Sequence, residues 1–261
     1  MIQGHYGPAG LLHFFFRDIS FTWLMISTQI IDMVFFAFVL CCKFVCKMEI
    51  HSCPQPLACL EYSSYNVSLM RENQAVPFNA QNDISHSLSG TLIWTLVFTG
   101  IYVLVNWRNN SRSFASLYGI FFLSISSHWL LDVVVRRNDV AVFPPFTSNK
   151  IGLGTWQHLS KLSNYLIEVG SAVLGWLFFF LVRKSSKLTK GFWISSLLYF
   201  LMTFGLMYGV YFAVDYSKIA DSVQDGSPTS PDQIPFTYFT YVLVGILSYF
   251  MERKVREIKT E

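Results

Sequence analysis

Six long apolar runs constrain the fold of this chain more than any other feature of its sequence. An α-helix needs about 20 apolar residues to cross the hydrocarbon core of a bilayer, and all but the last run approach that length. The sequence therefore predicts an all-α, polytopic helical membrane protein with about six transmembrane helices. The last span is short and needs support from its neighbours. The runs fall at about 19–43, 86–106, 113–135, 164–182, 191–214 and 236–251.

The composition also indicates a membrane protein. Of the 261 residues, 52% are hydrophobic and only 13% are charged, whereas soluble domains carry about 25% charged residues. The net charge of +3 is too small to indicate nucleic-acid binding. We therefore expect membrane lipids as partners, and no nucleic acid.

A short apolar segment at residues 7–16 precedes the first long run. It is too short to cross a bilayer alone, so we expect a half-span that turns back near Arg17. The N-terminus lacks the features of a cleaved signal peptide and should remain in the mature chain. We expect residues 1–261 to form a single helical membrane domain, with the candidate metal site in 1–170, further helices in 171–251 and a tail at 252–261.

The Lys and Arg residues near the span ends predict an orientation. Eleven of the 19 lie on the side that carries the tail, so the tail should be cytoplasmic. The long connections at 47–85 and 136–163 should then face the opposite, noncytoplasmic side. Asn66 begins a glycosylation sequon in the first of them, which predicts a glycoprotein, but Asn109 begins a second sequon on the cytoplasmic side.

Five cysteines lie close together in the sequence. Cys41, Cys42 and Cys46 stand at the end of an apolar run with a spacing that matches no zinc ribbon, so we expect lipid-facing or packed thiols. Cys53 and Cys59 lie in a polar connection, where they either pair or remain free according to its redox compartment.

His128 and Asp132 stand inside one of the apolar runs, in SSHWLLDVVV. Residues four apart share one face of a helix, roughly 5 to 6 Å apart at Cβ, so this pair can hold one ion. An ionisable group in a membrane is costly unless it is paired or lines a cavity, which makes the pair a candidate site. The alternative is a hydrogen-bonded pair that locks two helices together.

Asp32 and His86 stand in comparably apolar surroundings, and Asp83, three residues before His86, is the expected N-cap of the span that follows. The expected topology places both at the depth of His128 and Asp132, in the outer half of the membrane, and His5 joins them if residues 7–16 form a half-span. Asp32 could instead bridge neighbouring helices, and His86 could face lipid headgroups. Together the residues are a candidate ligand set: His5, Asp32, His86, His128 and Asp132.

Mixed His and Asp ligands suit Zn²⁺ best, and Fe or Mn as well. A Zn²⁺ with an open position lowers the pKa of bound water to about 7 and polarises a phosphoryl or acyl oxygen. Five ligands exceed the needs of one tetrahedral ion, so either one acts indirectly or two ions share the carboxylates.

Four other residues are candidates for roles beside the metal. Glu168 is an intramembrane carboxylate and a candidate catalytic residue, either as a general base or as a group that orients a ligand histidine. Arg136, Arg137 and Lys150 follow in the outer connection. Their charge and location make them candidates to bind the phosphate of a substrate.

Five short blocks resemble a known family. They are GHYGPA at 4–9, QIID at 29–32, SHSLSG at 85–90, SHWLLD at 127–132 and GLGTW at 152–156. They are similar to blocks of the bacterial membrane-bound metal-dependent hydrolases, a group regarded as distant relatives of zinc-dependent phospholipase C. The resemblance covers roughly residues 3–170 and implies an all-helical fold. It also implies metal binding by the five candidate ligands.

The chain departs from that family at three places, one of which is a longer connection at 47–85. It reads Arg136-Arg137-Asn138-Asp139 where close relatives read His-Arg-Pro-Asp, so a histidine that could act as ligand or acid is absent. Gln157 replaces an asparagine. These departures bear on turnover more than on metal binding.

The sequence thus predicts a metal-dependent membrane hydrolase in which metal-activated water attacks an ester, with a phosphoester of a lipid or amphiphile as the expected substrate. The alternative is a noncatalytic membrane protein with a buried His/Asp site, either a metal-binding scaffold or an ion or metal transporter. Transporters commonly show internal repeats, and we find no such symmetry here.

Overall fold

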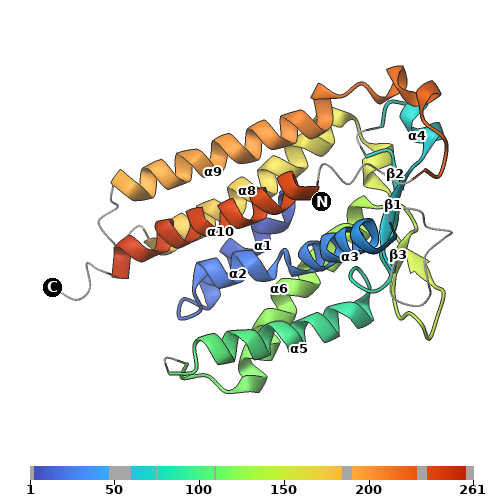
Figure 1. The fold of residues 1–261 in the computed structure, drawn as a ribbon. Helices are drawn as coiled ribbons and strands as arrows, with labels where there is room; N and C mark the ends of the chain where they lie inside the picture. Colours follow the sequence, from blue (N-terminus) through green and yellow to red (C-terminus); the bar gives the residue numbers. More distant parts are fainter. Residues whose placement is uncertain are drawn as a thin grey trace.

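The fold is mostly helical in this computed structural model, which describes residues 3–46, 60–74, 76–108, 110–183, 190–227 and 234–256 (Figure 1). The longer helices are α1 (Gly7–Phe15), α2 (Phe21–Ser27), α3 (Ile30–Cys46), α5 (Leu88–Val105), α6 (Phe114–Val135), α8 (Lys161–Arg183), α9 (Lys190–Tyr208) and α10 (Ile234–Arg256). Shorter helical segments are η1 (Gly4–Tyr6), α4 (Val67–Arg71), α7 (Thr155–His158), η2 (Gly209–Ala213), η3 (Tyr216–Lys218) and η4 (Ala220–Ser222).

Two small antiparallel ladders lie in the connections and were not predicted. Strand β1 (Tyr62–Tyr65) pairs with β2 (Phe78–Gln81), and β3 (Val140–Ala141) pairs with β4 (Lys150–Ile151). In Figure 1 the strands and α4 lie together at one end of the helical bundle. The predicted long connections at 47–85 and 136–163 therefore contain ordered structure.

Four helices are long and apolar enough to cross a membrane, namely α5, α6, α8 and the segment Lys190–Lys218 that begins with α9. The bent pair of α2 and α3 would make a fifth. This is compatible with an integral membrane protein. The predicted count of six is not confirmed, because the described apolar part of α10, Phe239–Glu252, is shorter than a full span.

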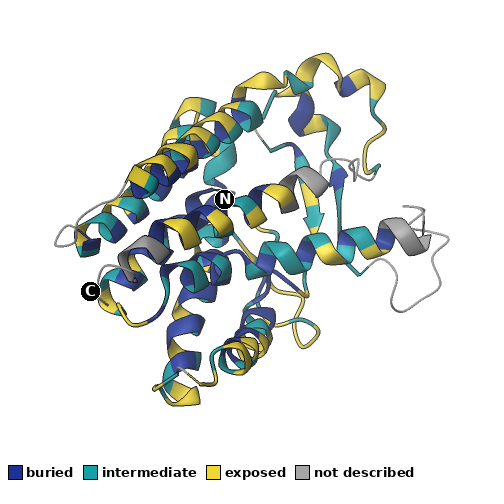
Figure 2. Cartoon of the chain, turned by 60° about the vertical axis from the view of Figure 1, so that its left-hand side comes forward, coloured by how far each residue is buried: buried dark blue, intermediate teal, exposed yellow. Residues whose placement is uncertain are grey.

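The burial pattern of α5 is the reverse of that in a soluble helix. Thr91, Thr95 and Thr99 are fully buried, while Leu96 and Leu104 on the outer face are 54% and 77% exposed. Each threonine hydroxyl donates to the carbonyl oxygen four residues earlier, at 2.7 to 2.9 Å, so it needs no water. Figure 2 shows exposed residues along the outer faces of the bundle and buried residues inside. Exposed leucines on a long helix fit contact with lipid.

Helix α1 confirms the predicted short helix at 7–16 and packs tightly against α8. A Cβ atom at Gly10 would lie 1.8 Å from the carbonyl oxygen of Gly175, and one at Gly175 would lie 2.6 Å from that of Gly7. These glycines let the two backbones touch, as small residues do between membrane helices. The turn after α1 is tied to the α5–α6 connection by the ion pair of Asp18 with Arg112.

Three sequence-based expectations need correction. The run at 19–43 is broken, because α2 and α3 meet at an angle of 49°. Asp83, expected to cap α5, instead accepts a hydrogen bond from Lys150, and the N-cap is Ser87, whose Oγ accepts from the Gly90 amide at 2.9 Å. Cys42 is disulfide-bonded rather than a thiol.

Several residues named in the sequence-based predictions lie outside the described residues. They are Cys53, Cys59, Asn109 and tail residues 257–261.

Candidate metal centre

The structure brings the five candidate ligands together from four places in the chain. His5 lies in η1, Asp32 in the first turn of α3, His86 just before α5, and His128 and Asp132 in α6. The closest contacts are 3.0 Å for His86 Nε2 to Asp32 Oδ1, 3.3 Å for His5 Nε2 to Asp132 Oδ1, and 3.6 Å for His128 Nε2 to Asp32 Oδ1. The predicted convergence of the five side chains is therefore present. Their role as ligands stays a prediction.

The break between α2 and α3 orients His128. A break frees backbone carbonyls from their donors within the helix, and the Thr28 carbonyl oxygen lies 2.6 Å from His128 Nδ1. A carbonyl only accepts hydrogen bonds, so Nδ1 carries a proton, and in the neutral ring Nε2 carries the lone pair. That lone pair faces the carboxylates of Asp32 and Asp132, at 3.6 and 4.0 Å.

His86 is oriented by the segment before α5. Its Nδ1 lies 2.7 Å from Ser85 Oγ, which leaves Nε2 facing Asp32. Glu61 holds this segment, because its Oε1 accepts hydrogen bonds from the amides of Ile84 and Ser85 at 2.7 and 2.6 Å. Burial raises the pKa of the Glu61 carboxyl.

His5 is positioned through Glu168 on α8. Glu168 Oε2 accepts hydrogen bonds from the amides of Gln3 and Gly4 at 3.1 and 2.8 Å. One turn along α8, Ser171 Oγ donates to the Gly4 carbonyl oxygen at 2.8 Å. These contacts hold the backbone beside His5. Both predicted roles of Glu168, as a general base and as a group that orients a ligand histidine, stay predictions.

The unpaired nitrogen atoms at this site fit metal binding. His5 Nδ1 and His128 Nε2 are buried and have no hydrogen-bond partner among the described residues, so no protein group occupies these two nitrogens. His5 and His128 stack with ring centroids 3.5 Å apart and planes 6° from parallel. Two imidazolium rings would repel each other at this distance, whereas neutral rings are the metal-binding form.

The candidate ligands form two groups of three. Within each group, one ligand atom from each residue lies within 4.8 Å of the other two. One group is His5, Asp32 and His128, and the other is His86, His128 and Asp132. His128 belongs to both, but its Nδ1 is engaged by Thr28, so only Nε2 can bind an ion. The two groups therefore describe alternative sets of ligands around one ion, or two ions of which only one binds His128.

Arg136 also reaches this centre. Its Nη1 lies 3.6 Å from Asp132 Oδ2, and its Nε and Nη2 donate to Asp139 Oδ1 and Asn82 Oδ1 at 3.1 and 3.2 Å. The side chain is only 8% exposed. Of the three predicted phosphate-binding cations, Arg136 is the one placed against a candidate ligand.

The other two predicted cations tie the connection at 136–163 to the segment before α5. Arg137 Nη2 donates to the Phe78 carbonyl oxygen at 2.9 Å, and Lys150 Nζ donates to Asp83 Oδ1 at 2.8 Å. Both side chains are partly exposed. Their contacts with protein groups do not place them at the metal centre.

Tyr241 also contacts the candidate ligands and was not predicted from the sequence. This residue lies on α10, and its hydroxyl donates to Asp32 Oδ2 at 2.7 Å. The run that contains it, FTYFTYVLVG, is rich in aromatic residues, and no sequence signal separates this tyrosine from its neighbours.

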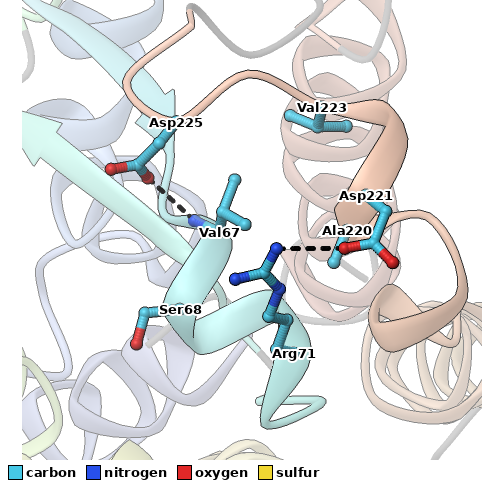
Figure 3. Close-up of a pocket in the computed structure, with 7 residues that line it drawn as sticks. All are labelled: Val67, Ser68, Arg71, Ala220, Asp221, Val223 and Asp225. Carbon is cyan, nitrogen blue, oxygen red and sulfur yellow. Dashed lines mark hydrogen bonds and ion pairs between the residues drawn. The ribbon is translucent and has the colours of Figure 1, made fainter.

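The centre is enclosed by protein. The side chains of His5 and His128 are fully buried, those of His86 and Asp132 are 5% exposed, and that of Asp32 is 13% exposed. A separate hollow of about 420 Å³ lies between α4 and η4, where Arg71 pairs with Asp221 at 3.0 Å and the Val67 amide donates to Asp225 (Figure 3). Its lining includes none of the candidate ligands.

Comparison of the chain with known protein families, with curated proteins and with solved structures finds no match. The fold and the site define a class of protein. It is a mostly helical protein with helices that could span a membrane and with a buried cluster of His and Asp side chains that could hold a metal ion.

Proposed function

We propose that the protein is a metal-dependent membrane hydrolase that cleaves an ester, with a phosphoester of a lipid or another amphiphile as the expected substrate. The observation that carries this proposal is the cluster of three histidines and two aspartates. Two of its buried imidazole nitrogens lack a hydrogen-bond partner among the described residues. Zn²⁺ is the expected metal, with Fe or Mn as alternatives.

A bound Zn²⁺ would supply an acidified water and a Lewis acid for the ester oxygen. The chain supplies the orientation of the donors. Thr28 fixes the tautomer of His128, Ser85 contacts the ring of His86, and Glu168 holds the segment that carries His5. Such supporting contacts typically change metal affinity or activity 10- to 100-fold.

The position of Arg136 supports the proposal that the substrate is anionic. Its guanidinium lies against Asp132 in an enclosed place, where a charge-assisted contact to a phosphate oxygen would be strong. Asp139 and Asn82 fix its orientation. A phosphate that approached the centre from this side would meet a cation already in position.

The enclosure of the centre requires movement before a substrate can enter. The contacts of Arg137 with Phe78 and Asn79, and of Lys150 with Asp83, hold the outer connection over this end of the bundle. They are partly exposed polar contacts, which are weak in water. We propose that this connection moves to admit the substrate.

Hydrolysis by the zinc-loaded full chain in nanodiscs tests the proposal. The panel would include phospholipids, sphingolipids and soluble phosphoesters. We expect turnover of at least one amphiphilic ester, which chelation and His128→Ala both abolish. Full metal occupancy with no hydrolysis across the panel would overturn the proposal.

One observation favours a second candidate, a metal or ion transporter. Broken helices at the binding site are typical of transporters, and Asp32 follows directly after the 49° break between α2 and α3. Uptake of zinc into proteoliposomes, lost in Asp32→Asn, would favour transport over hydrolysis.

A further inference from the structure

Tyr241 connects the C-terminal helix α10 to the candidate metal centre. It lies 209 residues from Asp32 in the chain, and its hydroxyl donates to Asp32 Oδ2 at 2.7 Å. The residue is 6% exposed. A buried tyrosine hydroxyl requires a partner, so this contact has either a packing role or a role at the site.

The two oxygens of Asp32 have different surroundings. Oδ1 lies 3.0 Å from His86 Nε2 and 3.6 Å from His128 Nε2, so it faces the other candidate ligands. Oδ2 accepts the hydrogen bond from Tyr241. The phenol therefore restrains rotation of the carboxylate and directs Oδ1 toward the histidines.

We propose that Tyr241 is a positioning residue of the metal centre, which presents Asp32 as a ligand through Oδ1. The proposal rests on the metal binding proposed above and extends it, because it makes α10 part of the site. Hydrogen-bonded partners of ligating carboxylates commonly tune metal affinity in this way.

Helix α10 has other attachments, so removal of this one hydroxyl need not detach it. Near its other end, Glu252 accepts hydrogen bonds from the side chains of Ser20 and Thr22 on the α2 side. The ring of Tyr241 also packs against Phe36, with centroids 6.3 Å apart. Tyr241→Phe retains this ring and removes only the donor.

Zinc affinity of the full chain in detergent, measured by competition with a chromogenic chelator, tests the proposal. We expect Tyr241→Phe to weaken zinc binding about 10- to 100-fold. Tyr249→Phe, on the same helix and 47% exposed, should leave the affinity unchanged. In an Asp32→Asn background, Tyr241→Phe should add less than about a twofold loss, because the two residues act through one contact.

Two negative results are distinguishable. If the wild-type chain binds no metal, the proposed function fails and this inference fails with it. If the wild type binds zinc and Tyr241→Phe binds it equally tightly, only this inference is overturned, and the contact is one of packing.

Hydrogen exchange of the wild-type chain gives a second test that does not require the variant to fold. Zinc should slow amide exchange in α10 around Tyr241 as well as in α3 and α6. Protection of α3 and α6 with no change in α10 would overturn the inference.

Discussion

The Thr28 carbonyl oxygen lies 2.6 Å from His128 Nδ1, and this contact joins a break in the helical backbone to the candidate metal centre. Irregular backbone is tolerated at membrane depth only where protein groups satisfy its polar atoms. His128 is such a group, since it is fully buried and its ring satisfies the freed carbonyl. The break in turn leaves Nε2 of the ring as the atom available to a metal.

We expect Glu168→Ala to weaken zinc binding about tenfold, because Glu168 accepts the Gln3 and Gly4 amides that hold the His5 segment. Glu168→Gln keeps one acceptor oxygen and should lose less. Chelator competition measures both, with the exposed Glu72→Ala as the control. Equal affinities for Glu168→Ala and the wild type would show that this segment does not depend on Glu168.

We expect Gly175→Ala to lower the stability of the protein by about 1 to 3 kcal/mol. The new Cβ atom would lie 2.6 Å from the Gly7 carbonyl oxygen and separate α1 from α8. Gly170→Ala is the matched control on the same helix, because a Cβ atom there meets nothing within 4 Å. Thermal unfolding in detergent compares the two. An equal effect of both substitutions would argue against the close α1–α8 contact.

The long apolar helices and the five clustered polar residues could be predicted from the sequence because each signal is local. Long apolar runs reveal helices, and His128 with Asp132 four residues apart reveal a shared face. The break after Ser27 was missed because Thr28 and Gln29 are not helix breakers like Pro or Gly. Tyr241 was missed because its partner Asp32 is distant in sequence. The Asp83 cap was wrong because Ser87 stands closer to the start of α5 and caps it.

Because of the ion pair of Asp18 and Arg112, the stability of the protein should vary with pH in the acid range. Hydrogen bonding to Arg112 holds the pKa of the Asp18 carboxyl below its ordinary value of 3.8. The ion pair therefore stabilises the protein above pH 3.8, and this stabilisation is lost as the pH falls through the lowered pKa of Asp18. It should be below about 1 kcal/mol, because the Asp18 side chain is 52% exposed.

Thermal unfolding of the wild type and Asp18→Asn, from neutral pH to below pH 3.8, measures how the stability depends on pH. The stability difference between the two should be largest at neutral pH and should vanish in acid. A difference that does not change with pH would assign the effect to something other than the ionised pair.

The predicted orientation can be tested at the two ends of α5. Ser68 and Ser111 are exposed and flank this helix in the chain. In a cysteine-free background, we expect Ser68→Cys to react with an impermeant thiol reagent on intact cells or on sealed vesicles of the corresponding orientation. Ser111→Cys should react only after permeabilisation. The reverse result would invert the orientation, and labelling of both from one side would show that α5 does not span the membrane.

Metal analysis of the detergent-purified chain by mass spectrometry tests the central claim most directly. The wild type should retain about one or two equivalents of a divalent metal, with zinc expected. His128→Ala and Asp132→Ala should each lose most of it, whereas His158→Ala, which removes an exposed histidine, should keep it. Absence of metal from the wild type after zinc loading, or full retention in both site variants, would contradict the account.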